Sequence, residues 1–187
     1  SEVLTIYGNS SGDYSGRAVD GDVDVNGDGY VDIFVSATGV SSSRGAVYAF
    51  YGPTSGTTYT AYADHTMTGS SSGDAFGEYL WATSDATGDG YDDLIVNAIG
   101  ADDNGADSGT LYVFTDPAND TGPSDAAVTI HGASAGDTLS YEVTMGDVDA
   151  DGSDDLLLCS PLHDSAGGAW LLYGPLSGTY TLDADED

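Results

Sequence analysis

The sequence predicts an all-β fold built from three copies of one repeat, and three observations lead to this prediction. An acidic nine-residue loop occurs three times, as "DVNGDGYVD" from Asp24, "DATGDGYDD" from Asp85 and "DVDADGSDD" from Asp147, with spacings of 61 and 62 residues. Each loop is followed by short apolar runs rich in β-branched and aromatic residues, which suit strands. No segment has a helical period long enough to predict a helix of consequence.

The first repeat contains four strand candidates. The first candidate, at residues 18–23, leads into the loop, and "IFVSA" at 33–37 leaves it directly. A third run, "AVYAFY" at 46–51, follows a glycine-bearing loop, and a fourth lies at 63–67. The later repeats keep this order, with "LIVNA" and "LLLCS" after their loops and then "GTLYVF" and "GAWLLY".

The repeats span residues 9–68, 69–131 and 132–187 of one repeat domain covering 1–187. Tandem domains that fold alone are the alternative, but about sixty residues in four strands bury too little surface for independence. Copies packed side by side are therefore predicted. Residues 2–8 ("EVLTIYG") align with the fourth strand of the other repeats, and the third copy stops before its own fourth strand. We expect this segment to complete the third repeat.

The acidic loop has the chemistry of a hard-cation site. Positions 1, 3, 5 and 9 carry oxygen-bearing side chains, position 6 is glycine, and the carbonyl of position 7 is expected to face inward. Calcium takes six to eight oxygen ligands, and a tight turn at glycine brings alternate side chains to one centre. The predicted ligands are Asp24, Asn26, Asp28, Tyr30 and Asp32 in the first loop, Asp85, Thr87, Asp89, Tyr91 and Asp93 in the second, and Asp147, Asp149, Asp151, Ser153 and Asp155 in the third.

Other interpretations of the loop fit the sequence less well. An EF-hand needs a glutamate at position 12 and flanking helices, but position 12 is Val35, Val96 or Leu158 within a strand run. Zinc or copper sites use histidine or cysteine, and the three histidines and Cys159 occupy unrelated places in the repeat. A simple solvated aspartate–glycine turn would explain one copy better than three at matching offsets.

The loops and their surroundings resemble the FG-GAP repeat of integrin α-subunit β-propellers and of bacterial surface proteins, and the resemblance covers nearly the whole chain. Phe76-Gly77 matches the first half of the motif, while Ser15-Gly16 and Leu139-Ser140 depart from it. The resemblance implies that each repeat is a four-stranded β-propeller blade whose calcium loop joins its first two strands. Three blades are fewer than the usual four to eight, so a larger or oligomeric propeller is expected, either as a segment of a longer array or through association of copies.

Charge restricts the partners of the chain. Two arginines oppose 32 acidic residues, for a formal charge of −30, so no basic patch exists to bind nucleic acid or anionic membranes. No apolar run is long enough for membrane insertion. Three calcium ions, each with two positive charges, would bring the formal charge to −24. The third loop has four carboxylates and the others three each, so we expect the third to bind calcium most tightly and the second, with Thr87, most weakly.

The expected function is that of an extracellular calcium-binding module that mediates adhesion through its loops, with a protein or glycan ligand. The alternative is a structural repeat that assembles with copies of itself in a surface layer or fibre. A non-catalytic part of a hydrolase is a third hypothesis, because some proteins with such repeats carry a separate catalytic domain.

Catalytic residues are not expected. His163 has Asp164 and Ser165 beside it, but adjacent residues rarely form a triad, so an ordinary polar loop is the preferred interpretation. By the resemblance, the loops at 39–45 and 100–109 lie opposite the calcium loops, where ligands bind in the family. Asn9 and Asn119 begin glycosylation sequons.

Overall fold

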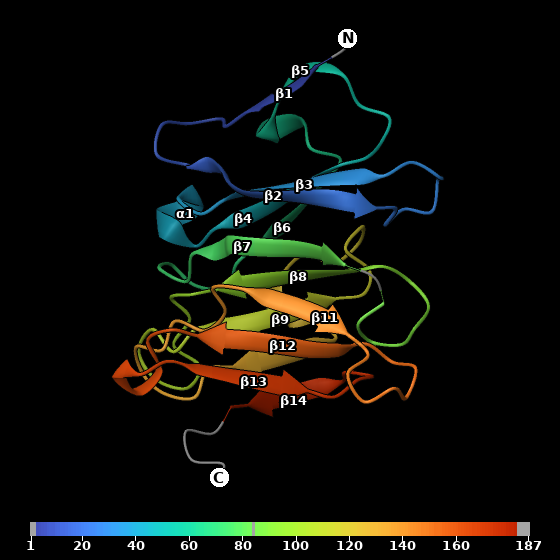
Figure 1. Cartoon of the computed structure of the whole chain (residues 1–187). Helices are drawn as coiled ribbons and strands as arrows, with labels where there is room; N and C mark the ends of the chain where they lie inside the picture. The colour runs from blue at the N-terminus through green and yellow to red at the C-terminus, as the bar shows by residue number, and fades with distance from the viewer. Residues whose placement is uncertain (1–2, 84, 183–187) are drawn as a thin grey trace.

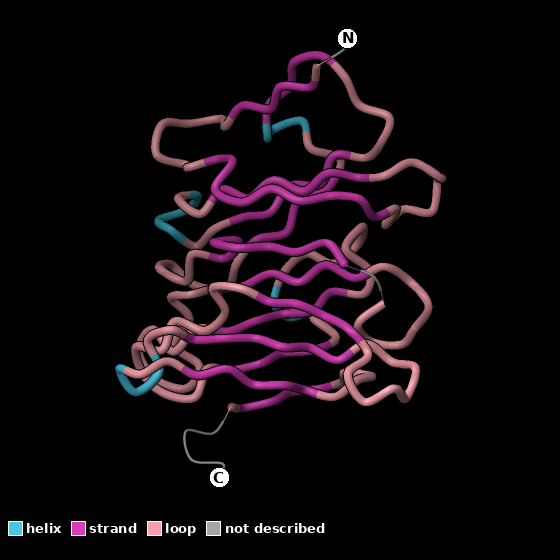
Figure 2. The backbone as a smooth tube through the Cα atoms, in the orientation of Figure 1, coloured by secondary structure: helices cyan, strands magenta, loops and turns pink. Residues whose placement is uncertain are grey.

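The structure is a computed structural model that describes residues 3–83 and 85–182. Residue 2 of the expected N-terminal strand and residues 183–187 of the third repeat lie outside the described residues. The described chain is all-β, with short strands joined by loops and a few single-turn helices (Figure 2). None of the described helices is long and apolar enough to cross a membrane.

Each repeat contributes one sheet, antiparallel except where a strand of the third repeat pairs in parallel with the edge of the second sheet. The first sheet has the order β2-β3-β4-β6, the second β14-β10-β9-β8-β7 and the third β11-β12-β13. The first sheet consists of β2 (Ser15–Val23), β3 (Asp32–Ala37), β4 (Ala46–Phe50) and β6 (His65–Thr68). The second consists of β7 (Phe76–Thr83), β8 (Asp93–Ala98), β9 (Thr110–Phe114), β10 (Val128–His131) and β14 (Gly178–Thr181). The third consists of β11 (Val143–Gly146), β12 (Asp155–Ser160) and β13 (Gly168–Leu172).

The remaining elements connect or flank these sheets. The pair β1 (Leu4–Tyr7) and β5 (Gly56–Tyr59) forms a separate two-stranded sheet. The single-turn helices are α1 (Val40–Ser43), η1 (Thr60–Tyr62), η2 (Pro123–Asp125) and η3 (His163–Ser165). The four strands predicted for the first repeat are thereby confirmed, with ends shifted by up to three residues.

The sheets stack face to face in a row, with β1 and β5 at one end and β13 at the other (Figure 1). Successive residues of a strand point to opposite faces, and the second sheet is apolar on both faces because it has a sheet on either side. Phe34, Phe76 and Phe114 belong to the core between the first and second sheets. Ile95 and Leu156 belong to the core between the second and third.

Within a single chain, β1 is not the fourth strand of the third sheet, which is the place predicted for residues 2–8. β1 pairs in parallel with β5, and among the described residues β13 has only β12 as a neighbour. The cause is the open row of sheets: none of them closes on itself, so β1 and β13 lie at opposite ends of the molecule (Figure 1).

Two glycines allow neighbouring repeats to approach closely. Gly45 has a φ of +86°, and a Cβ at this position would overlap the backbone of Phe76 in the next repeat. Gly109 has a φ of +78°, and its Cβ would overlap the backbone of Leu139 in the same way. Only glycine meets both demands, the left-handed backbone and the absence of a side chain.

Candidate metal centres

The three acidic loops leave the stack at one edge, where each joins the first two strands of its sheet. The loops follow β2, β7 and β11 and lie on the same side of the row of sheets (Figure 1). The loops after β3, β8 and β12 lie at the opposite edge (Figure 1). The acidic loops and the loops at 39–45 and 100–109 therefore lie at opposite edges, as the resemblance implied.

A repeated network of hydrogen bonds shapes the first loop around Asp24. Asp24 Oδ1 accepts hydrogen bonds from the backbone N–H groups of Gly27 at 2.8 Å and Asp28 at 3.1 Å, and its Oδ2 accepts one from Gly29 at 2.7 Å. Asp28 Oδ1 accepts one from Tyr30 N–H at 2.9 Å. The carboxylate at position 1 thus folds the glycine turn around itself, in the manner of aspartates that bond to the backbone of turns.

The other two loops repeat this network at the same positions. Asp85 Oδ1 and Oδ2 accept from Asp89 N–H at 2.9 Å and Gly90 N–H at 2.7 Å. Asp147 accepts from Asp151 and Gly152 N–H groups, each at 3.1 Å. In both loops, position 5 again accepts from position 7. The shared geometry means that one local conformation serves three different sequences.

In the third loop, three carboxylates converge. Asp147, Asp149 and Asp151 are exposed, and one oxygen of each lies within 4.8 Å of the others. The first and second loops have only two carboxylates at these positions because Asn26 and Thr87 stand at position 3. Among the described residues, the convergent triad that could hold a metal ion is thus found in the third loop, the one expected to bind most tightly.

The aspartate at position 9 has a second task that the sequence interpretation missed. Asp32 is buried, and its two oxygens accept from Val25 N–H at 3.0 Å and Gly52 N–H at 2.9 Å. Asp155 is held in the same way by Val148 N–H at 2.8 Å and Gly174 N–H at 2.9 Å. Position 9 therefore clamps the loop to the turn after the third strand. The recurrent "YGP" at 51–53 and 173–175 was the available signal.

The second loop lacks half of this clamp. Asp116 replaces the glycine found at 52 and 174, and Asp93 accepts from Ala86 N–H at 2.7 Å and Thr87 N–H at 3.1 Å through Oδ2 alone. In the described part of the chain, Asp93 Oδ1 and Thr87 Oγ1 are both buried without a hydrogen-bond partner. Unpartnered buried oxygens are costly, so these two atoms are suited to a cation.

The pKa values of the position-9 carboxyls differ because their burial and their hydrogen-bond donors differ. Burial raises the pKa of Asp93 to about 7, and the neighbouring charges of Asp89 and Asp85 add to the effect. Burial also raises the pKa of Asp32. The hydrogen bond from Gly174 N–H lowers the pKa of Asp155 below its ordinary value. The second loop therefore holds the carboxyl that most needs a compensating positive charge.

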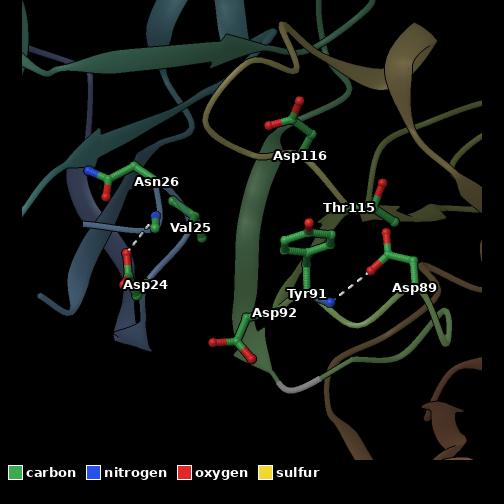
Figure 3. A pocket seen from close by; sticks show the side chains of 9 residues that line it. Asp24, Val25, Asn26, Asp89, Tyr91, Asp92, Thr115 and Asp116 are labelled. Carbon is green, nitrogen blue, oxygen red and sulfur yellow. Dashed lines mark hydrogen bonds between the residues drawn. The ribbon is translucent and has the colours of Figure 1, made fainter. Parts of the chain in front are cut away.

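A pocket of about 380 Å³ lies between the first and second loops. Figure 3 shows Asp24 and Asn26 on one side of it and Asp89 and Tyr91 on the other. Asp92 and Asp116 add two further carboxyl groups to its lining. This concentration of negative charge attracts cations to the edge that carries the loops.

The histidine considered in the sequence has a structural partner. His163 is buried, and its Nδ1 lies 2.9 Å from Asp137 Oδ2. Its ring contacts Trp170 edge-on at 5.1 Å between centroids. Among the described residues, no serine or cysteine is hydrogen-bonded to the His163 ring, so the imidazole ties the turn at 134–137 to the loop after β12.

The two sequon asparagines also form hydrogen bonds within the chain. Asn9 Oδ1 accepts a hydrogen bond from Ala61 N–H at 3.2 Å. Asn119 donates one to Asp116 at 2.9 Å. Asn9 thus ties its loop to η1, and Asn119 helps to order its own loop.

Comparison with known proteins adds no assignment. No family model matches the chain, and no curated protein matches it.

Proposed function

We propose that the protein is an extracellular calcium-binding module of the FG-GAP kind, in which each sheet is a β-propeller blade and each acidic loop holds one calcium ion. The main support is the network of hydrogen bonds between carboxylates and backbone N–H groups, which recurs in three loops at one edge of the molecule. In the third of these loops, one oxygen each of Asp147, Asp149 and Asp151 lies within 4.8 Å of the others. Hard oxygen ligands in a tight glycine turn favour calcium over transition metals.

Three further observations support calcium. The buried oxygens of Asp93 and Thr87 gain a partner if an ion occupies the second loop. A chain with a formal charge of −30 also gains from divalent cations, because they reduce the repulsion that opposes compaction. The first loop combines the same network with Asn26 at position 3, whose amide oxygen is an accepted calcium ligand.

Isothermal titration of the chelator-treated chain with calcium tests this proposal directly. We expect three binding sites and a melting temperature that rises as they fill, since ligands that converge only in the folded state link binding to stability. A chain that binds no calcium at millimolar concentration, and that melts at the same temperature in calcium and in chelator, would disprove it.

The biological role that fits such a module is adhesion through the loops at the edge opposite the calcium loops. These loops, after β3, β8 and β12, contain glycine, serine and aspartate and connect rigid strands, a usual arrangement for binding surfaces. Screening the calcium-loaded chain on glycan and matrix-protein arrays tests this role. Binding should be lost when these loops are exchanged for short glycine–serine turns and kept when η2 is altered.

A second function, a structural repeat that assembles with copies of itself, is favoured by a separate observation. In the part of the chain that the structure describes, the outermost strands β1 and β13 each have an edge with no neighbouring strand in their sheet. Exposed strand edges readily pair with other chains.

A further inference from the structure

The outer face of the third sheet exposes an apolar side chain that the other sheets bury. Leu157 on β12 corresponds to Phe34 on β3 and to Ile95 on β8, because each is the second residue after the position-9 aspartate. Phe34 and Ile95 are 0% exposed and pack on the following sheet, whereas Leu157 is 42% exposed. The third sheet thus presents a packing face without its partner.

The outer face of the first sheet shows the reciprocal feature. Val19 on β2 corresponds to Leu80 on β7 and Val143 on β11, since each pairs with the third residue after the position-9 aspartate. Leu80 and Val143 are 5% and 7% exposed and pack on the preceding sheet, whereas Val19 is 64% exposed. The two ends of the molecule therefore lack opposite halves of the same interface.

The strand edges at the two ends are complementary as well. β10 lies between β9, which is antiparallel to it, and β14, which is parallel. β1 has the same parallel neighbour in the same register, with Leu4 opposite Gly56 as Val128 is opposite Gly178. The place that β9 takes beside β10 is free beside β1. β13 is the counterpart of β9, and within residues 3–83 and 85–182 no strand pairs with the edge of β13 that corresponds to the β10 side of β9.

Backbone hydrogen bonds between turns complete the internal interfaces. Ala75 N–H donates to Ser43 carbonyl at 2.8 Å, and Thr138 N–H donates to Asp107 carbonyl at 3.0 Å. At the two ends, the corresponding residues are Tyr14 and Ser165.

These end residues already have the required conformation. The φ of Tyr14 is 53°, against 53° for Ala75 and 50° for Thr138. The φ of Ser165 is 62°, against 60° for Ser43 and 52° for Asp107. Such left-handed backbone is uncommon outside glycine, so both halves of the contact are preformed.

We propose that a second copy of this chain docks head to tail on the third sheet, so that β1 of one copy becomes the fourth strand beside β13 of the other. The register follows from the internal pairs Leu111–Ile130 and Val113–Val128. It places Ile6 opposite Ala169 and Leu4 opposite Leu171, and brings Leu157 against Val19. The inference stands on strand pairing and burial, and is independent of the calcium sites.

The same docking repeats at every free end, because the two surfaces differ and each copy carries both. Such a heterologous contact generates a closed ring if the rotation closes and a filament if it does not. Repulsion between copies of formal charge −30 opposes docking. High salt should promote it, since the screening length falls to about 3 Å at 1 M.

Two variants test the docking by sedimentation velocity in 1 M sodium chloride with calcium present. Leu157→Asp damages the third-sheet face and Val19→Asp damages the first-sheet face, and both positions are exposed in the single chain. We expect the wild type to form rings or larger species and each variant alone to be monomeric. An equal mixture should form 1:1 dimers and nothing larger, because only one pair of intact faces remains. Ser124→Asp, which adds the same charge at the exposed η2 turn, should assemble like the wild type.

Other results would overturn the proposal. A wild-type chain that stays monomeric up to about 1 mM would show that these faces take another occupant. Variants that assemble like the wild type, or a mixture that remains monomeric, would exclude head-to-tail docking through these residues. Circular dichroism of each variant, and of the milder Leu157→Gln and Val19→Gln, verifies that the chains are folded. Calcium titration of the same samples reports separately on the proposed function.

Discussion

At the scale of single residues, the acidic loops divide their oxygens between two tasks. Position 1 orders the turn, as Asp24, Asp85 and Asp147 each bind the backbone of position 6. Position 9 clamps the loop to the sheet, and this clamp is complete around Asp32 and Asp155. The spacing of carboxylates predicted the shared centre. It could not reveal the clamp, because the donors Gly52 and Gly174 lie 20 and 19 residues further along the chain.

The incomplete clamp of Asp93 predicts a pH dependence. Its pKa is about 7 in the folded chain, against 3.8 ordinarily, so the folded state binds this proton more tightly than the unfolded state. The stability gained from the proton is complete below about pH 4 and is lost as the pH rises to about 7. In chelator, we expect the wild type to lose roughly 2–4 kcal/mol of unfolding free energy from this group between those limits.

Urea unfolding at pH 5 and pH 8 measures the effect. Asp93→Asn, which imitates the neutral carboxyl, should show a smaller decrease between the two pH values than the wild type. Glu142→Gln removes an exposed carboxylate outside the loops and should behave like the wild type. Equal decreases in all three chains would assign the pH dependence to general charge repulsion.

Calcium affinities should follow the number of carboxylates. Asp151→Ala removes one carboxylate of the convergent triad and should abolish the tightest site, whereas Asp89→Ala should remove the weakest. We expect the two losses to differ by at least tenfold in dissociation constant, or about 1.4 kcal/mol. Titration calorimetry with Glu142→Gln as the control gives the order. The reverse order would contradict carboxylate counting and favour the unpartnered oxygens of the second loop as the stronger determinant.

At the scale of elements, alternation and turn residues predicted the four antiparallel strands of the first repeat, and β2, β3, β4 and β6 lie where these patterns occur. β5 and β14 were not predicted. Their sequences, "GTTY" and "GTYT", are short, polar and half exposed, and they become strands only through a parallel partner far away in the chain. A local pattern cannot reveal such pairing, although the recurrence of the two tetrapeptides was visible.

The close approach of the second and third sheets at Gly109 predicts that alanine lowers stability more at Gly109 than at Gly136. Gly109 and Gly136 have φ values of +78° and +84°, so alanine introduces a similar backbone cost at each, of order 1 kcal/mol. At Gly109 the added methyl group also overlaps the Leu139 backbone, whereas at Gly136 it meets nothing within 4 Å. We expect Gly109→Ala to cost at least about 2 kcal/mol more than Gly136→Ala. Chemical denaturation compares the two, and equal losses would show that the sheets can separate slightly.

At the scale of the whole molecule, charge and architecture oppose each other. Three sheets share two cores, yet 32 acidic residues and two arginines surround them. Composition predicted this conflict and the repeat predicted the stack. The small number of repeats also predicted that a single chain would not close into a ring, and β1 does lie at the far end from β13. The angle between successive sheets, on which closure depends, could not be predicted from the residue pattern.

Calcium removal should therefore lower the melting temperature of the whole stack. At a calcium concentration of about 100 times the dissociation constant, each filled site adds about 2.7 kcal/mol. For a chain of this size, one such site corresponds to roughly 5–10 °C. Differential scanning calorimetry in calcium and in chelator, at equal ionic strength, separates site binding from screening. A similar rise with sodium chloride alone would contradict specific sites.

The pairing of β14 with β10 also bears on how such a chain could have arisen by duplication. β14 follows the third sheet in sequence but extends the second, so the third unit lends a strand to its predecessor, as the first unit lends β5 to β1. A gene segment cut at the boundaries of the sequence motif would leave one sheet a strand short and carry an orphan strand with it. Recombination that preserves the fold would have to insert or delete whole multiples of the unit, which makes the number of copies, rather than the content of any one copy, the variable that evolution can change freely.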